Sequence, residues 1–137
     1  MVKYLIASHV TYSIGTKDFL DFMVGKNDNV FTLSAFMNDE SLDTLINNKM
    51  NEIGDYDQLI IFVDIHGGSV EQALFLRFNK NQKIKIISGF NLPLVMEILF
   101  QNKVLTDDEI EQSIMACHYS IVNLKTTDLS NDDEDLI

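Results

Sequence analysis

The sequence Ile60-Ile-Phe-Val-Asp64-Ile-His66-Gly67-Gly68-Ser69 joins an apolar run to a group of polar and glycine residues. A second stretch, Tyr4-Leu-Ile-Ala-Ser-His9, has the same design and ends in a histidine. Short apolar runs that end in turn residues and precede a helical pattern are typical of strands buried in a parallel sheet. The two stretches therefore predict two neighbouring strands with polar side chains at their carboxyl ends.

The rest of the chain alternates strand and helix patterns. Strands are expected at 2–8, 30–36, 59–63 and 84–89, and a weak pattern for a last strand lies at Ile121–Leu124. Small polar residues that suit helix starts occur at Ser13, Asn38–Asp39, Ser69, Asn91 and Thr106. Glu109 follows Thr106 by three residues, which fits a capping box.

This alternation predicts an α/β fold: a doubly wound, mostly parallel four-stranded sheet with helices on both faces. The common strand order is 2-1-3-4, to which Ile121–Leu124 would add an extra C-terminal antiparallel strand. Ligands of such sheets bind at the carboxyl ends of strands 1 and 3, where these strands are neighbours. His9 and Asp64 are therefore expected in adjacent loops.

Composition limits the class of protein. A length of 137 residues with 46% hydrophobic content suits one core, which we expect at residues 1–125. Residues 126–137 are expected to be an acidic, disordered tail. The net charge of −11 argues against nucleic-acid binding. No apolar run reaches the roughly 20 residues of a membrane helix, and no secretory signal pattern occurs, so we expect a cytoplasmic protein without direct membrane insertion.

His9 is the candidate nucleophile of the predicted site. Asp64 would hold one ring nitrogen of His9, fix its tautomer and stabilise positive charge on the ring. Gly67 and Gly68 let backbone N–H groups approach an anion, and Ser69 adds a hydroxyl at a helix N-terminus. Together these residues predict phosphoryl transfer through histidine. The structural alternatives are a solvated loop histidine and an aspartate that only caps a turn.

Other reactive residues are assigned plainer roles. His66 is interpreted as an exposed loop residue, with a second titrating group near the site as the alternative. His118 is expected at the surface or an interface. The single cysteine, Cys117, excludes an intramolecular disulfide and is expected to be buried and inert. Neither a nucleotide-binding loop nor metal-ligand spacing occurs, so no cofactor and no metal are expected.

Three motifs give the chain a family resemblance. Leu5-Ile-Ala-Ser-His9, the run Val63-Asp64-x-x-Gly67-Gly68-Ser69 with Ala73, and Gly89-x-Asn91-Leu92-Pro93 occur in this order. They resemble the IIA component of the mannose/fructose/sorbose family of the bacterial phosphoenolpyruvate-dependent sugar phosphotransferase system. The resemblance spans roughly residues 2–124.

The resemblance implies a cytoplasmic phosphotransferase component with a phosphohistidine intermediate. The phosphocarrier protein HPr would phosphorylate His9, and His9 would pass the group to a IIB component for sugar uptake. Asp64 would pair with His9, and Gly67, Gly68 and Ser69 would lie at the phosphate. A homodimer is implied, with the segment at Ile121–Leu124 in the subunit contact.

The chain departs from the family pattern beside both motifs. Val10 follows the histidine where a small residue is usual, His66 replaces an aromatic or aliphatic residue, and Val70-Glu71-Gln72 replaces Pro-x-Asn. These changes leave a regulatory module with the same fold as an alternative. The phosphoryl-donor subunit of a dihydroxyacetone kinase is a second alternative, because it shares the fold and the histidine, although its glycine turn differs. A flavodoxin-type flavin domain fits poorly, because the loop after His9 lacks its hydroxyl- and glycine-rich pattern.

Overall fold

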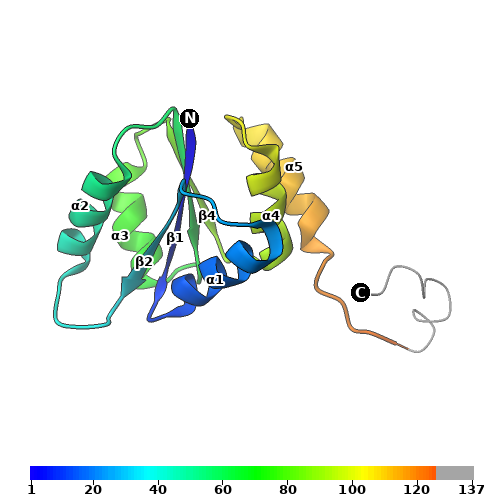
Figure 1. The fold of residues 1–137 in the computed structure, drawn as a ribbon, viewed down its shortest axis with the longest axis horizontal. Helices are drawn as coiled ribbons and strands as arrows, with labels where there is room; N and C mark the ends of the chain where they lie inside the picture. Colours follow the sequence, from blue (N-terminus) through cyan, green and yellow to red (C-terminus); the bar gives the residue numbers. More distant parts are fainter. Residues whose placement is uncertain (126–137) are drawn as a thin grey trace.

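The computed structural model describes residues 1–125, so the expected acidic tail at 126–137 lies outside the described residues. All four strands run parallel in the order β2-β1-β3-β4, which confirms the predicted fold class and strand order (Figure 1). The elements in chain order are β1 (Val2–His9), α1 (Tyr12–Val24), β2 (Val30–Ala35), α2 (Leu42–Ile53), β3 (Gln58–Val63), α3 (Ser69–Phe78), β4 (Ile84–Ser88), α4 (Leu92–Gln101) and α5 (Asp107–His118).

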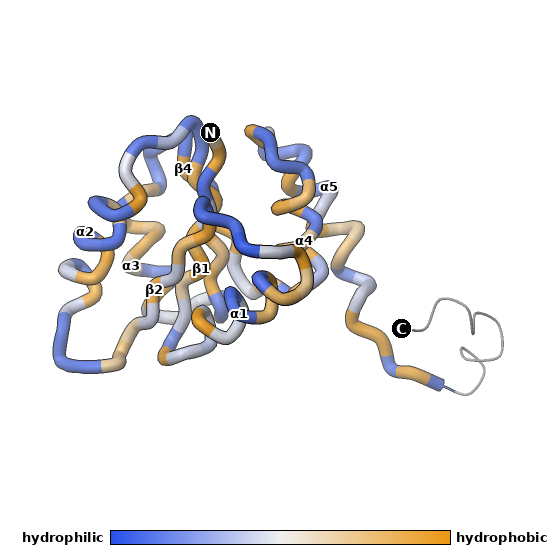
Figure 2. The backbone as a smooth tube through the Cα atoms, viewed as in Figure 1, coloured by the Kyte–Doolittle hydropathy of each residue, from blue (hydrophilic) through white to orange (hydrophobic). Residues whose placement is uncertain are grey.

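The helices form a layer on each face of the sheet. In Figure 1, α2 and α3 lie on one side of the strands, and α1, α4 and α5 lie on the other. Figure 2 shows that the strands in the middle are mostly hydrophobic. Every residue of β3 is buried, because β3 lies between β1 and β4 and has helices on both faces. This accounts for its unbroken apolar run.

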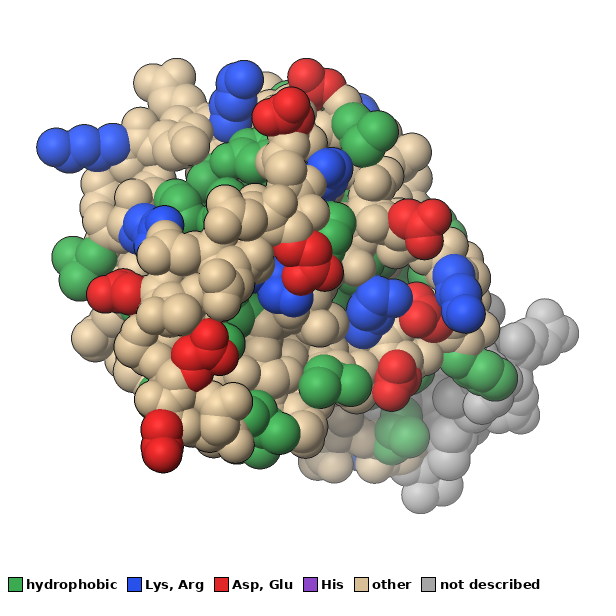
Figure 3. Space-filling model, turned by 60° about the vertical axis from the view of Figure 1, so that its left-hand side comes forward, with side chains coloured by type: hydrophobic (Ala, Val, Ile, Leu, Met, Phe, Trp, Pro, Cys, Tyr) green, Lys and Arg blue, Asp and Glu red, His purple; other side chains and the backbone are tan. Residues whose placement is uncertain are grey.

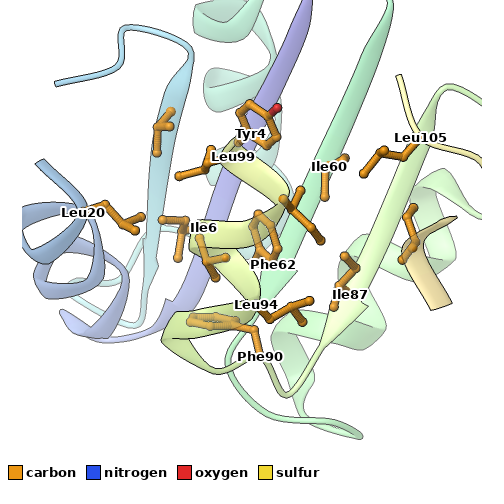
Figure 4. Packing of buried hydrophobic residues seen from close by; sticks show 14 of the residues in the cluster. Tyr4, Ile6, Leu20, Ile60, Phe62, Ile87, Phe90, Leu94, Leu99 and Leu105 are labelled. Carbon is orange, nitrogen blue, oxygen red and sulfur yellow. The ribbon is translucent and has the colours of Figure 1, made fainter. Parts of the chain in front are cut away.

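Alternate residues of the inner strands supply two separate cores. Ile6 and Phe62 belong to the core under α1, α4 and α5, which Figure 4 shows from close by. Leu5 and Ile61 point to the opposite face and belong to the core under α2 and α3. Both cores therefore fix β1 and β3, the two strands that lead to His9 and Asp64.

Two of the expected helix starts were wrong. Thr11 precedes α1, and Ser13 lies buried inside the helix, where its N–H donates to Ser8 Oγ at 2.7 Å and its hydroxyl to the Leu33 carbonyl at 3.2 Å. A long-range contact with the strands thus replaces the local cap. Helix α2 begins after Ser41 rather than at Asn38–Asp39, because the Ser41 hydroxyl accepts the Thr44 N–H.

The later helix starts were predicted correctly. Helix α3 begins at Ser69, and Thr106 forms the expected capping box with Glu109 at the start of α5. Asn91 caps α4, since its side-chain oxygen accepts the Leu94 N–H at 3.0 Å. Its amide nitrogen also donates to the Cys117 carbonyl at 3.0 Å and so ties α4 to the end of α5.

The extra C-terminal strand is not part of this sheet. The chain leaves α5 and leads away from the strands in Figure 1, without strand pairing over Ile121–Leu124. Ile121, Val122 and Leu124 are 80%, 66% and 63% exposed. A strand requires a hydrogen-bonded neighbour, and within one chain this segment does not reach either edge of the sheet. The orange colour of this stretch in Figure 2 marks it as an apolar segment left uncovered.

Charged side chains of both signs share the surface. Figure 3 shows acidic and basic residues interspersed over the face that carries α2 and α3. Lys49 and Glu52 pair at 2.8 Å on α2, and Lys85 on β4 pairs with Asp107 on α5 at 2.8 Å. Such exposed pairs contribute little to stability, since solvent screens them. Within residues 1–125, no helix is long and apolar enough to cross a membrane.

Candidate functional site

His9 and Asp64 meet at the carboxyl edge of the sheet, as the strand order predicts. His9 is the last residue of β1, and Asp64 directly follows β3. The β1–β3 register pairs Ala7 with Val63, and the Asp64 N–H donates to the Ala7 carbonyl at 3.2 Å. Two buried, paired strands therefore set the separation of the two side chains.

The Asp64 carboxylate holds His9 at two points. Its Oδ2 atom accepts the His9 backbone N–H at 2.8 Å and lies 3.0 Å from His9 Nδ1. Its other oxygen accepts the Ile65 N–H at 3.0 Å. The Asp64 side chain is 9% exposed, whereas the His9 side chain is 32% exposed. A carboxylate at Nδ1 places the ring proton there and leaves a lone pair on Nε2.

The free nitrogen of His9 faces the start of α3. Ser69 Oγ lies 3.3 Å from His9 Nε2, so the hydroxyl can donate to the ring. Gly68 packs against the ring, since a Cβ atom added there would lie 3.3 Å from His9 Cε1. The first N–H groups of a helix have no intrahelical acceptor and favour anions. His9 Nε2 is thus next to a hydroxyl and a helix N-terminus.

The N–H groups of the glycine turn already have acceptors in this structure. Gly67, at φ +82°, donates to Glu71 Oε2 at 2.6 Å. Gly68 donates to the Ile65 carbonyl at 3.3 Å. The phosphate-binding role of Gly67 and Gly68 stays a prediction, and the Gly67 N–H would have to leave Glu71 to contribute to it.

One residue beside His9, Phe36, was not identified from the sequence. The ring of Phe36, just after β2, stacks on the His9 ring with centroids 5.4 Å apart and planes 28° apart. Phe36 and Val10 both have left-handed backbone, at φ 63° and 54°. A non-glycine residue in this region is strained, and most of all a β-branched one. The strand order, which puts the end of β2 beside the end of β1, was the available signal for Phe36.

His66 is exposed, as expected, but it is not isolated. Its side chain is 86% exposed, and its Nδ1 lies 2.7 Å from Glu71 Oε1. Ser88 Oγ is buried, makes no hydrogen bond of ordinary geometry and faces the same carboxylate. The Ser88 hydroxyl, the His66 ring and the Gly67 N–H favour the charged form and lower the pKa of Glu71 to about 2.

His118 and Cys117 lie in surroundings that suggest no catalytic role. His118 is exposed and contacts the Tyr119 ring edge-on at 5.4 Å. Cys117 is buried as expected, and its thiol donates to Glu97 Oε2 at 2.8 Å. Burial and the Glu97 carboxylate raise the pKa of Cys117 to about 11. In the part of the chain that the structure describes, no group of three His, Cys, Asp or Glu side chains could hold a metal ion.

Comparison with known proteins agrees with the motifs and the fold. The model of the PTS system fructose IIA component family matches residues 3–115. The chain therefore belongs to this family of phosphotransferase-system components, with the mannose-type α/β fold.

Individual relatives match along most of their length. A PTS system fructose-specific EIIA component of Bacillus subtilis is 20% identical over 99% of this chain and 100% of its own. The crystal structure of a putative phosphotransferase-system permease from Klebsiella pneumoniae has a TM-score of 0.81 at 26% identity and covers 92% of this chain and 93% of its own. The PTS IIA protein associated with the fucose utilization operon of Streptococcus pneumoniae has a TM-score of 0.78 at 25% identity, covering 92% and 95%.

Proposed function

We propose that this protein is a phosphoryl carrier of a sugar phosphotransferase system in which His9 accepts the group from phospho-HPr and passes it to a IIB component. The observation that supports this most directly is the orientation of the His9 ring. Asp64 lies at Nδ1, 3.0 Å away, and Ser69 Oγ and the α3 N-terminus lie beside the opposite nitrogen. Asp64, Gly67, Gly68 and Ser69 are the remaining members of the proposed site.

The proposed transfer forms one P–N bond and breaks another. The lone pair of His9 Nε2 attacks phosphorus, the P–N bond to the donor histidine breaks, and the donor ring keeps that electron pair. His9 keeps its proton at Nδ1, so the phosphorylated ring is cationic and lies against the Asp64 carboxylate. Ser69 Oγ and the α3 N-terminus favour the phosphoryl oxygens by hydrogen bonding and charge. Transfer to the IIB component repeats the step in reverse.

The surroundings of His9 favour a protein as donor and acceptor. Apolar side chains near the carboxyl ends of the strands are about half exposed, which is typical of an interaction surface rather than of a solvated edge. The net charge of −11 fits protein partners rather than nucleic acid, and we place the protein in the cytoplasm with its donor. These apolar residues are Val10, Tyr12, Phe36, Met37 and Ile65.

We also propose a homodimer in which Ile121–Leu124 pairs with β4 of a second copy. β4 is an edge strand, and a groove of about 580 Å³ lies along it between α3 and α5. Phe75, Ile86 and Ile110 are among the residues that line it. An edge strand can accept the backbone of an added strand, and the apolar residues of the groove can cover part of the uncovered apolar segment.

Phosphorylation tests the function. The protein is incubated with phosphoenolpyruvate, enzyme I and HPr, and acid-labile phosphate is measured. Wild type should label and His9→Ala should not, whereas His118→Ala should label fully. Full labelling of His9→Ala would exclude His9, and absence of label in wild type beside a labelled control IIA protein would exclude the carrier function.

The dimer has its own test. Light scattering after gel filtration should give the mass of two chains for wild type and of one chain for Val122→Asp with Leu124→Asp. A variant with Met115→Asp and Tyr119→Asp, two exposed positions near the end of α5, serves as control and should stay dimeric. A dimer that survives the Val122 and Leu124 substitutions would exclude this segment from the contact.

A further inference from the structure

Two consecutive residues near the start of α3 bond to the two peptide groups that flank the Gly67 Cα atom. Glu71 Oε2 accepts the Gly67 N–H at 2.6 Å, and Gln72 Nε2 donates to the Gly67 carbonyl at 3.3 Å. Gly67 is at φ +82°, so the turn depends on a conformation that other residues rarely adopt. These contacts fix the orientation of the turn relative to the helix that follows it.

The same turn touches the His9 ring. Gly68 follows Gly67 and lies so close that an added Cβ would stand 3.3 Å from His9 Cε1. Ser69 is next, and its hydroxyl lies 3.3 Å from His9 Nε2. A rotation of the Gly67 peptide would therefore change both contacts of the nitrogen that is proposed to attack phosphorus.

We propose that Glu71 is a positioning residue for phosphoryl transfer: it clamps the Gly67 peptide and so places Gly68 and Ser69 against His9. This inference rests on the proposed function of His9, and in it the Gly67 N–H holds the turn on Glu71 rather than binding the phosphoryl group. Glu71 acts through the turn, because its carboxylate contacts His66 and Gly67 rather than His9. Glu71 stands between Val70 and Gln72, the two positions at which the chain departs from the Pro-x-Asn pattern.

A second anchor keeps the carboxylate in place. Glu71 Oε1 lies 2.7 Å from His66 Nδ1, and the Glu71 side chain is only 16% exposed although His66 is 86% exposed. The Glu71 carboxylate thus bonds to two successive residues of the turn, His66 and Gly67, and ties both to α3. An anionic side chain in the first turn is also favoured by the helix dipole.

A comparison of Glu71→Gln with Glu71→Ala separates the positioning role of the side chain from the effect of its charge. Glu71→Gln keeps an oxygen for the Gly67 N–H, whereas Glu71→Ala removes it. Transfer from phospho-HPr is followed by rapid quench over a range of phospho-HPr concentrations. Glu71→Ala should lower the maximal transfer rate about tenfold, since small misplacements of reacting groups are costly, with the half-saturating concentration unchanged. Glu71→Gln should stay within about twofold of wild type, because the clamp is preserved.

Glu52, exposed in the last turn of α2 and not among the residues that line the β4 groove, provides the matched pair of control variants. Glu52→Ala and Glu52→Gln should transfer at the wild-type rate. A wild-type rate in Glu71→Ala would overturn the proposal. So would an equal loss in Glu71→Ala and Glu71→Gln, which would assign the effect to charge.

A spectroscopic measurement separates failure of this inference from failure of the carrier function. The ¹⁵N resonance of His9 Nε2 reports its hydrogen bond with Ser69 without any phosphate present. In Glu71→Ala this resonance should move toward its position in Ser69→Ala, while Glu71→Gln should match wild type. An unmoved resonance in Glu71→Ala would refute the clamp even if the protein carries phosphate. A moved resonance with no labelling of wild type would support the clamp and refute the carrier function alone.

Discussion

Replacing Asp64 by asparagine removes one charge and almost no volume from the site. In the structure, Oδ2 contacts the His9 N–H and Nδ1 at 2.8 and 3.0 Å, and the other oxygen accepts the Ile65 N–H. Asparagine can keep its single oxygen toward His9, at the cost of the Ile65 contact. The folded geometry should therefore survive with a loss of about 1 kcal/mol, the usual value of one hydrogen bond.

The free-energy barrier to phosphoryl transfer should rise by more than the free energy of unfolding falls. A hydrogen bond to a charged group contributes about 1.5–3 kcal/mol, which corresponds to about 10- to 150-fold in rate if it acts only on the phosphorylated, cationic ring. His9 is 32% exposed, so solvent screening favours the lower part of this range, about 10- to 30-fold.

The assay is single-turnover transfer from phospho-HPr, with urea unfolding in parallel. Asp108→Asn, the same substitution at an exposed position in the first turn of α5, is the control and should transfer at the wild-type rate. An unchanged rate in Asp64→Asn would refute the reasoning, because Asp64 would then only cap the turn. A rate that falls in proportion to lost folded protein would refute it as well.

Three further predictions concern strain, pH and thiol chemistry. Val10→Gly should stabilise the protein by about 1 kcal/mol in urea unfolding, because φ 54° is costly for valine and not for glycine; a destabilised variant would contradict this. The Glu71 pKa of about 2 lies below its ordinary value of 4.5, so the stability it contributes is present above pH 4.5 and is lost as pH falls toward 2. Unfolding midpoints of Glu71→Gln should therefore depend less on pH in this window, and parallel curves would disprove the link. Cys117, whose pKa is raised to about 11, should react with iodoacetamide at pH 8 far more slowly in the native protein than in urea; equal rates would place the thiol at the surface.

The placement of His9 beside Asp64 was predictable because it depends on a regular pattern. Apolar runs with short connections define the parallel sheet, and its common strand order brings the ends of β1 and β3 together. The starts of α4 and α5 were predictable for a related reason, since Asn91 and Thr106 bond to groups three residues away. Local patterns of this kind are visible in the sequence.

Most of what escaped prediction depends on contacts between distant residues. Ser13 looked like a helix cap, but Ser8 and Leu33 take up its hydrogen-bonding groups in the fold. The contact of Glu71 with Gly67 is local, yet the sequence suggested only that an acid enters the first turn of α3. The strand pattern at Ile121–Leu124 has no neighbour within one chain, and the sequence alone does not reveal whether a partner supplies one.

The register of β1 and β3 also sets the distance between His9 and Asp64. The pairing of Ala7 with Val63 fixes where each strand ends, and a slip of one residue would displace Asp64 by about 3.3 Å and turn the neighbouring side chains to the opposite core. A slipped register would therefore disrupt the site and the packing of the core together. Val10, Phe36 and Ile65, by contrast, lie beyond the strand ends, where their side chains can change without altering this register. Such a division would let these side chains change without changing the spacing of His9 and Asp64.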